Sequence, residues 1–172
     1  DTHRPALHPH GLGHDNRRRR RVADVDAAVE AGLADLDGHA DVGGVGRGKS
    51  FLMDCFFQAV PLTRKTRLHF HEFMREVHRE LQELKGIADP LEELGKRIAR
   101  RFRLICFDEF HVADVTDAMI LHRLLDALFR NRVSIVTTSN FHPDELYPNG
   151  LHRDRILPAI ELLKANLEVI NV

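Results

Sequence analysis

Four glycines, a lysine and a serine are concentrated in one short stretch near the first quarter of the chain. The stretch fits the pattern G-x4-G-K-[ST] at every required position, with Gly43, Gly44, Val45, Gly46, Arg47, Gly48, Lys49 and Ser50. Glycines let a backbone curl until several N–H groups converge on one anion, and a helix that begins near Lys49 would add its positive N-terminal dipole. The alternative interpretation is a chance glycine-rich turn. We predict that residues 43–51, which end at Phe51, bind the phosphates of a nucleotide.

Two residues of this stretch would take part in the chemistry directly. The Lys49 ammonium would contact the β- and γ-phosphates, where it would stabilise the charge that develops during phosphoryl transfer. The Ser50 hydroxyl would bind Mg²⁺, as the hydroxyl at this position of the pattern does in phosphate-binding loops. The sequence therefore predicts a site for a triphosphate together with a divalent cation.

Two carboxylates follow a continuous apolar run, Leu104-Ile105-Cys106-Phe107. We expect this run to be a buried strand that carries Asp108 and Glu109 at its carboxyl end, where ligands of open α/β sheets bind. Asp108 is predicted to bind the magnesium ion, and Glu109 to polarise the water that attacks the γ-phosphate. In the alternative interpretation both acids cap the strand and face solvent.

Three polar residues further along the chain are additional candidates. The side-chain amide of Asn140 could reach between the γ-phosphate and the water, although Asn also begins turns, and both interpretations stay open. Arg153 or Arg155 could neutralise transition-state charge on the nucleotide of a neighbouring subunit. Surface arginines paired with Asp154 or Glu161 are an equal alternative, and the sequence does not decide between the two arginines.

Apolar residues beyond Gly43 predict the elements that must position these groups. Helices are expected over 73–84, 90–102 and 117–130, because apolar residues recur there at helical spacing. Asp89 and Pro90 would cap and begin the second helix, and Thr116 or Asp117 would cap the third, whose apolar residues from Met119 to Phe129 predict burial against a sheet. Strands are expected at 104–107, 133–140 and 167–172. Apolar strands separated by helices predict a parallel sheet that is covered on both faces.

The first 42 residues have a different composition. They contain no Phe, Tyr, Ile, Met, Lys, Ser or Cys, and all ten Phe of the chain lie beyond them. Residues 1–21, with five consecutive arginines at 17–21, are expected to be a solvated tail, and residues 22–36 have the spacing of one short amphipathic helix. We predict an atypical polar and basic segment over 1–42 and the globular core over 43–172.

Charge and cysteine usage exclude several classes of protein. With 25 Lys and Arg against 26 Asp and Glu, the formal net charge is -1, which gives no overall basic excess for nucleic acid or anionic lipid. The sequence has no run of 18 apolar residues and no secretory signal at its start, so we expect a soluble protein without a transmembrane segment. Cys55 and Cys106 lack a CxxC spacing and are expected to be buried free thiols in a reducing compartment.

Several segments of the sequence together resemble the AAA+ ATPases of the ZapE family, which are bacterial division-associated proteins with mitochondrial AFG-like relatives. The segments are GGVGRGKSFLMD, LHFHEFM, CFDEFHVADVTDAM and TSNFHPDELYPNGLHRDRILPAI. The resemblance covers about residues 43–172. It implies a three-layer α/β P-loop NTPase core of AAA+ type that oligomerises and uses ATP and Mg²⁺. It also implies that Lys49, Ser50, Asp108, Glu109 and Asn140 have the roles given above.

The resemblance further implies Mg-dependent ATP hydrolysis that remodels or regulates a protein partner. The implied partner is the tubulin-like FtsZ of the division ring, and the implied location is the bacterial cytoplasm, with peripheral association at the division site. A mitochondrial-type ATPase of protein quality control, located in the matrix, is one alternative. A catalytically weak nucleotide-binding scaffold is another.

The sequence departs from the family pattern at both ends of the core. A phosphate loop should follow a buried strand, but residues 37–42 are a poor strand by any pattern, which suggests that residues 1–42 come from an out-of-frame translation of GC-rich DNA. The family continues beyond the position of Val172 into a small helical lid. We therefore expect the lid, with part of the adenine site, to be absent.

Overall fold

The computed structural model describes residues 48–148 and 150–170. The predicted tail over 1–21, the predicted helix over 22–36 and the glycine-rich residues 43–47 lie outside this part of the chain. The described elements follow the order α2 (Gly48–Ala59), β1 (Lys65–His69), α3 (Phe70–Glu83), α4 (Pro90–Arg101), β2 (Leu104–Asp108), α5 (Val115–Arg130), β3 (Ser134–Thr137), the 3-10 turns η1 (Pro143–Glu145) and η2 (Arg153–Arg155), and α6 (Leu157–Asn166).

The described strands form one parallel sheet in the order β1-β2-β3, with β2 in the centre. In the register of this sheet Arg67 lies beside Cys106, and His69 lies beside Asp108. Because side chains alternate along a strand, Arg67, His69, Cys106 and Asp108 share one face of the sheet. Phe107 points to the opposite face. The predicted parallel sheet is confirmed.

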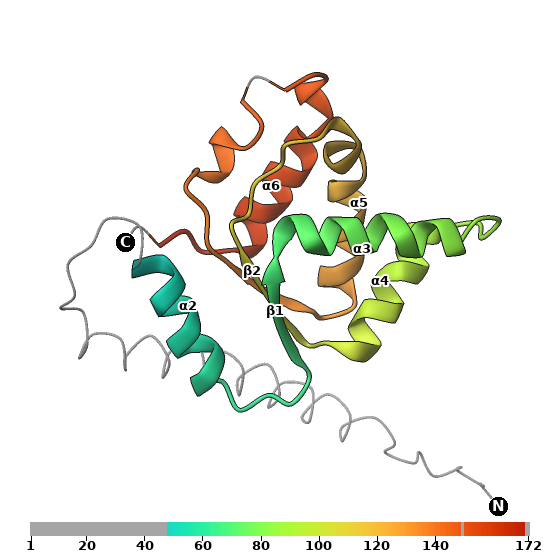
Figure 1. Ribbon diagram of the computed structural model, residues 1–172. Coiled ribbons are helices and arrows are strands. Elements are labelled where there is room, and N and C mark those ends of the chain that lie inside the picture. Colours follow the sequence, from blue (N-terminus) through green and yellow to red (C-terminus); the bar gives the residue numbers. More distant parts are fainter. Residues whose placement is uncertain (1–47, 149, 171–172) are drawn as a thin grey trace, which may run out of the picture.

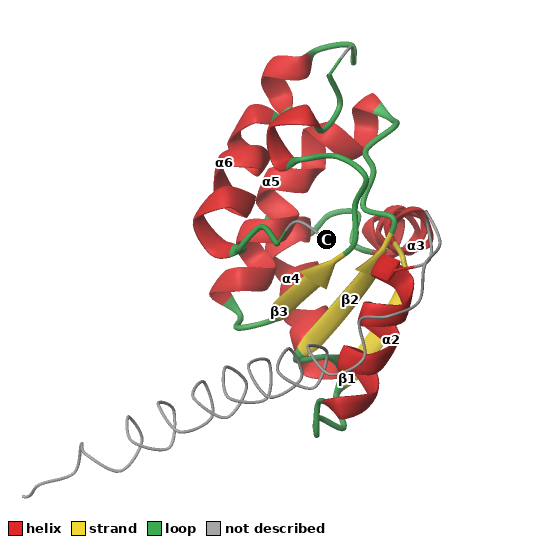
Figure 2. Ribbon diagram, turned by 90° about the vertical axis from the view of Figure 1, so that its left-hand side faces the viewer, coloured by secondary structure: helices red, strands yellow, loops and turns green. Residues whose placement is uncertain are grey.

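Helices cover both faces of this sheet, as the two views show (Figure 1, Figure 2). On one face α2 packs Met53, Phe56 and Val60 against Leu104 and Cys106 of β2. On the other face, α4, α5 and α6 enclose the larger core, which includes the β2 side chains that point away from α2. The three layers agree with the predicted fold class.

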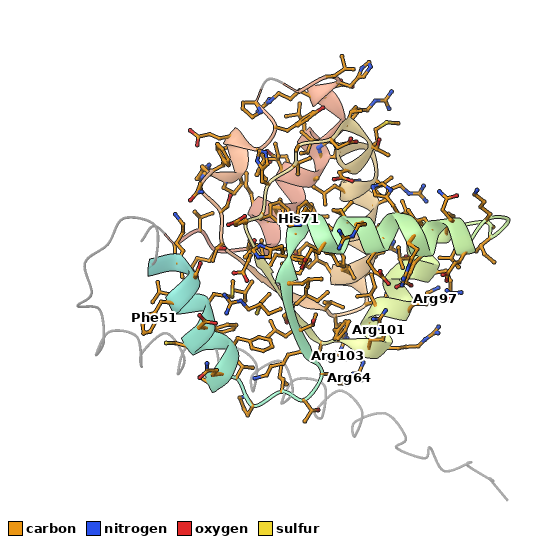
Figure 3. All side chains as sticks on the ribbon, viewed as in Figure 1. Phe51, Arg64, His71, Arg97, Arg101 and Arg103 are labelled. Carbon is orange, nitrogen blue, oxygen red and sulfur yellow. The ribbon has the colours of Figure 1, made fainter. Side chains whose placement is uncertain are left out.

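Helix α2 and strand β1 run in opposite directions. Only residues 60–64 connect them, and β1 runs back along the helix toward the first turn of α2 (Figure 1). Lys65 fixes this connection, because its Nζ donates a hydrogen bond to the Val60 carbonyl at 2.7 Å and another to the Phe57 carbonyl. The first turn of α2 therefore lies at the carboxyl end of the strands. In Figure 3, His71 marks this end of the sheet, and Arg64 and Arg103 mark the opposite end.

Helix caps account for the start of two helices. The Asp89 carboxylate accepts a hydrogen bond from the Glu92 N–H at 3.1 Å, and Pro90 is the first residue of α4, as predicted. Helix α5 begins earlier than predicted, because the Asp114 side chain accepts from the Thr116 N–H at 2.5 Å. The prediction of Thr116 or Asp117 as the cap was wrong. Most apolar residues of α5 are buried, but Met119 faces solvent.

The predicted strand over 167–172 does not form in its described part. Residues 167–170 have no regular structure, and residues 171–172 lie outside the described residues. A strand is stabilised by the backbone groups of a neighbour, and none of the three described strands pairs with this segment. Val169 and Ile170 remain exposed.

Candidate active site

The two predicted carboxylates, Asp108 for the metal and Glu109 for the water, lie at the end of β2 and in the turn that follows it. Asp108 ends the strand with a side chain that is 14% exposed, whereas the side chain of Glu109 extends into solvent. The backbone of Glu109 has a φ of 54°, in the left-handed region that is unfavourable for residues with a Cβ. Such strain persists only where the surrounding contacts impose it, and it concentrates at functional sites.

Residues that follow β3 hold this strained turn. The Thr138 Oγ1 accepts a hydrogen bond from the Glu109 N–H at 3.2 Å, and the Thr138 carbonyl accepts one from the Phe110 N–H at 2.8 Å. The Ser139 hydroxyl donates to the Phe110 carbonyl at 2.9 Å. Thr138 and Ser139 belong to the strand predicted over 133–140, but the sequence indicated no role for Thr138. Its position directly after a β-branched strand was the available signal.

An aromatic cluster supports the turn from the opposite face of the sheet. Phe107, directly before Asp108, has its ring 4.8 Å from the ring of Phe73 and 5.6 Å from that of Phe70. The Phe110 ring lies 4.2 Å from that of Phe70. These four side chains are buried, so the backbone on both sides of Asp108 and Glu109 is anchored in the core.

The first turn of α2 supplies the described end of the phosphate-binding stretch. Gly48, Lys49 and Ser50 begin this helix, whose first N–H groups have no partner within the helix. Asp108 points to the sheet face that α2 covers, so the predicted phosphate and metal residues belong to the same face and the same end of the sheet. Phe51 is exposed and points away from the sheet (Figure 3).

Arg67 joins these two parts of the site and was missed by the sequence analysis. Its Nε donates to Asp108 Oδ2 at 2.6 Å, and its Nη2 donates to Asp108 Oδ1 at 3.2 Å. Its Nη1 donates to Asp54 on α2. The hydrogen bond to Asp108 raises the pKa of Arg67, and Asp54 raises it further, although burial acts in the opposite direction. The only available signal was a cation inside a short strand that leads toward the site.

His69 ends β1 beside Asp108. Its Nδ1 lies 3.9 Å from Glu109 Oε2, and this nitrogen is buried without a hydrogen-bond partner among the described residues. The imidazole rings of His69 and His71 stack with their centroids 5.6 Å apart. Both residues lie at the junction of β1 and α3.

The remaining candidates lie further along the chain. Asn140 is exposed and follows the end of β3 by three residues. Arg153 donates from Nη2 to the Asp144 carbonyl at 2.8 Å, and Arg155 Nε lies 3.5 Å from Asp154 Oδ2. The pairing of Arg155 with Asp154 is the contact that the surface interpretation expects. The role of either arginine toward a second subunit stays a prediction.

The donors at this end of the sheet fit Mg²⁺. Ser50 and Asp108 supply a hydroxyl and a carboxylate oxygen, and Mg²⁺ is usually held by one or two carboxylates together with water and substrate phosphates. Within residues 48–148 and 150–170, no three or more His, Cys, Asp or Glu side chains gather so that they could hold a metal ion by themselves. One hydroxyl and one carboxylate are a set of protein ligands that suits a cation bound together with a triphosphate.

Comparisons with known proteins agree with the fold. Residues 41–172 match the family model of the AFG1-like ATPases. The chain is 55% identical over 130 residues to the cell division protein ZapE of Escherichia coli (strain K12), which covers 76% of this chain and 35% of that protein. It is 42% identical over 146 residues to lactation elevated protein 1 homolog B of Danio rerio, which covers 78% of this chain and 29% of that protein.

A third relative is an uncharacterised protein of Schizosaccharomyces pombe, 44% identical over 134 residues, which covers 74% of this chain and 30% of that protein. The chain thus spans about a third of the length of the curated relatives it matches. No solved structure matches the chain. Among the described helices, none combines the length and the apolar character that crossing a bilayer requires.

Proposed function

The chain belongs to the AFG1-like ATPase family, and from that premise we propose that it binds ATP with Mg²⁺ at the carboxyl end of its sheet and hydrolyses it. One observation carries this proposal. Asp108 ends the central strand, Glu109 follows it directly, and Asp108 points to the face that α2 covers. Helix α2 begins at the same end of the sheet with the Gly48-Lys49-Ser50 part of a phosphate-binding pattern.

Each side chain has a defined task in this proposal. The Lys49 ammonium binds the β- and γ-phosphates, while the Ser50 hydroxyl and the Asp108 carboxylate hold the cation. Mg²⁺, when bound, neutralises charge on the phosphate oxygens. Glu109 extends from a turn that is fixed by Thr138, and it orients the attacking water and accepts its proton.

Residues from other loops complete the proposed site. Asn140 contacts the γ-phosphate and the water from the segment after β3. Arg153 or Arg155 reaches the nucleotide of a neighbouring copy, so the chain acts as a homo-oligomer with composite sites. The role of Arg153 requires that its hydrogen bond to the Asp144 carbonyl opens when subunits meet.

The proposed use of ATP follows from a relative. Because the Escherichia coli relative is named a cell division protein, we propose that ATP hydrolysis by this protein drives the remodelling or regulation of a division protein. The partner would be the tubulin-like FtsZ of the division ring, and the protein would act in the cytoplasm at the division site.

Phosphate release by the purified chain tests the proposed enzyme activity. Lys49→Ala should abolish ATP binding, whereas Glu109→Gln should retain binding and lower kcat about 100-fold or more, because it removes only the general base. Glu83→Gln, at an exposed position near the end of α3, is the matched control and should match the wild type. Specific activity should rise with protein concentration if the site is composite.

Two outcomes would contradict this proposal. The wild type could bind ATP without turnover above the Glu109→Gln variant, which would identify a nucleotide-binding scaffold. ATP could also fail to bind at all, which would exclude the site itself.

A further inference from the structure

We propose that Arg67 is a positioning residue of the nucleotide site, which holds the Asp108 carboxylate in place and opposes the binding of a divalent cation there. The inference rests on the function proposed above, because it assigns Asp108 to the metal. It concerns a residue on β1 that is not part of the phosphate-binding pattern or of the acidic turn.

The geometry of the Arg67–Asp108 pair fixes the carboxylate. Two nitrogens of the guanidinium donate to the two carboxylate oxygens, at 2.6 and 3.2 Å. This fork-to-fork contact restricts the carboxylate in both direction and rotation, which a point-like ammonium group cannot do. Both side chains are largely buried, at 19% exposed for Arg67 and 14% for Asp108, so water competes little for the contact.

A second carboxylate shares the same guanidinium. The third nitrogen of Arg67 donates to Asp54, which lies on α2 and is 54% exposed. Asp54 is one turn beyond Ser50 on this helix. Arg67 thus ties the helix that begins with the phosphate-binding residues to the tip of the metal-binding strand. Asp54 can also neutralise the charge of the Arg67 guanidinium when the contact between Arg67 and Asp108 loosens.

The charge of Arg67 has a direct consequence for metal binding. A guanidinium and a divalent cation that share the Asp108 carboxylate repel each other, and the low exposure of the pair limits screening by solvent. Arg67 therefore lowers the gain in ATP affinity that the cation provides. At the same time its positive charge supports the binding of ATP without a metal. The ratio of the two ATP affinities reports both effects.

The experiment measures the dissociation constant of a fluorescent ATP analogue, once with Mg²⁺ and once with EDTA. For Arg67→Gln, we expect the ratio of the EDTA value to the Mg²⁺ value to rise about tenfold, because a free Asp108 binds the cation more strongly. Arg67→Lys keeps the charge but loses the fork-to-fork contact, so its ratio should stay closer to that of the wild type than the ratio of Arg67→Gln. If Arg67 only stabilised the fold, its substitution would weaken ATP binding equally with Mg²⁺ and with EDTA. An unchanged or lower ratio for Arg67→Gln would therefore overturn the inference.

A second variant keeps the test informative if Arg67→Gln does not fold. Asp54→Asn removes the competing carboxylate and leaves the guanidinium to Asp108 alone, so the ratio should fall below that of the wild type. A rise in this variant would overturn the inference. The matched control is Arg79→Gln, because Arg79 is an exposed arginine of α3 whose contact is the neighbouring Glu76. Its ratio should equal that of the wild type.

The same measurement separates failure of this inference from failure of the proposed function. If the wild type binds the analogue and Mg²⁺ strengthens binding, an unchanged ratio in Arg67→Gln overturns only the role of Arg67. If the wild type does not bind the analogue under either condition, both the proposed function and the role of Arg67 are overturned.

Discussion

The Glu109 N–H donates a hydrogen bond to the Thr138 hydroxyl at 3.2 Å, so the turn that carries the proposed general base is held by the residue that follows the neighbouring strand β3. Thr138→Val removes this acceptor with almost no change of shape. We expect kcat for ATP hydrolysis to fall several-fold, with KM nearly unchanged, because the strained turn loses the contact that fixes Glu109. The free energy of unfolding should change by about 1 kcal/mol or less.

Thr63→Val is the control for this change, since Thr63 is exposed in the connection before β1. It should leave kcat unaltered. Equal kcat in Thr138→Val and the wild type would show that the hydroxyl does not position Glu109.

Helices α4 and α5 are in close contact at Gly95. A Cβ on Gly95 would lie 2.6 Å from the Cβ of Ala127 and 3.2 Å from its carbonyl carbon. We expect Gly95→Ala to lower the free energy of unfolding by about 1–3 kcal/mol, as measured by urea denaturation. Ala127→Gly in the same chain should restore part of the loss, because it removes the closest atom. Strictly additive effects of the two substitutions would contradict this packing.

The two cysteines should differ in reactivity. Burial raises the pKa of the Cys106 thiol to about 12, whereas Cys55 on α2 is only half-buried. Near pH 8 a thiol reagent should therefore label Cys55 in the folded protein, and Cys106 should react only after unfolding, because the thiolate is the nucleophile. Cys55→Ser should remove the rapid phase of labelling by the thiol reagent. Rapid labelling of Cys106 in that variant would contradict its burial under α2.

The caps of α4 and α5 should make the fold sensitive to acid. Hydrogen bonds from Thr116, from its side chain first and then from its backbone N–H, lower the pKa of Asp114 below its ordinary value of 3.8. The pKa of Asp89 is lowered chiefly by the Glu92 N–H. A carboxylate with a lowered pKa stabilises the fold fully above its unfolded pKa, and this stabilisation is lost as the pH falls through the folded pKa.

Asp114→Ala tests this pH dependence. The variant should be less stable than the wild type at about pH 6, and the difference in urea midpoint should narrow below about pH 3, where the wild-type carboxylate is protonated. A constant difference across this pH range would show that the charge of Asp114 does not contribute to the cap.

Local patterns predicted the central elements of the fold because those elements are defined by local physics. Strand β2 is buried on both faces, which is why residues 104–107 form a continuous apolar run. The start of helix α4 is marked in the sequence by the cap residue Asp89 and by Pro90, which is the first helical residue. The start of α5 was harder to predict from the sequence, because several residues that can cap a helix lie within four positions. Only the backbone conformation selects Asp114 as the cap.

Contacts between distant residues were not predictable in the same way. Arg67 and Asp108 are 41 positions apart, and they meet because the register of two parallel strands brings their side chains to one face. The C-terminal segment has the composition of a strand, but a strand also needs a neighbour, which composition does not specify. Strand β1 lacks a continuous apolar run, because Lys65, Arg67 and His69 make its α2 face polar.

The most direct test of the central claim is whether Ser50 and Asp108 act on one cation. Calorimetry would give ATP affinity with and without Mg²⁺ for Ser50→Ala, Asp108→Asn and the double variant. We expect each single substitution to remove most of the increase in ATP affinity that Mg²⁺ provides. The double variant should lose little more of this increase than the more damaging single variant does. A full gain from Mg²⁺ in Asp108→Asn, or losses that simply add, would contradict a shared metal site.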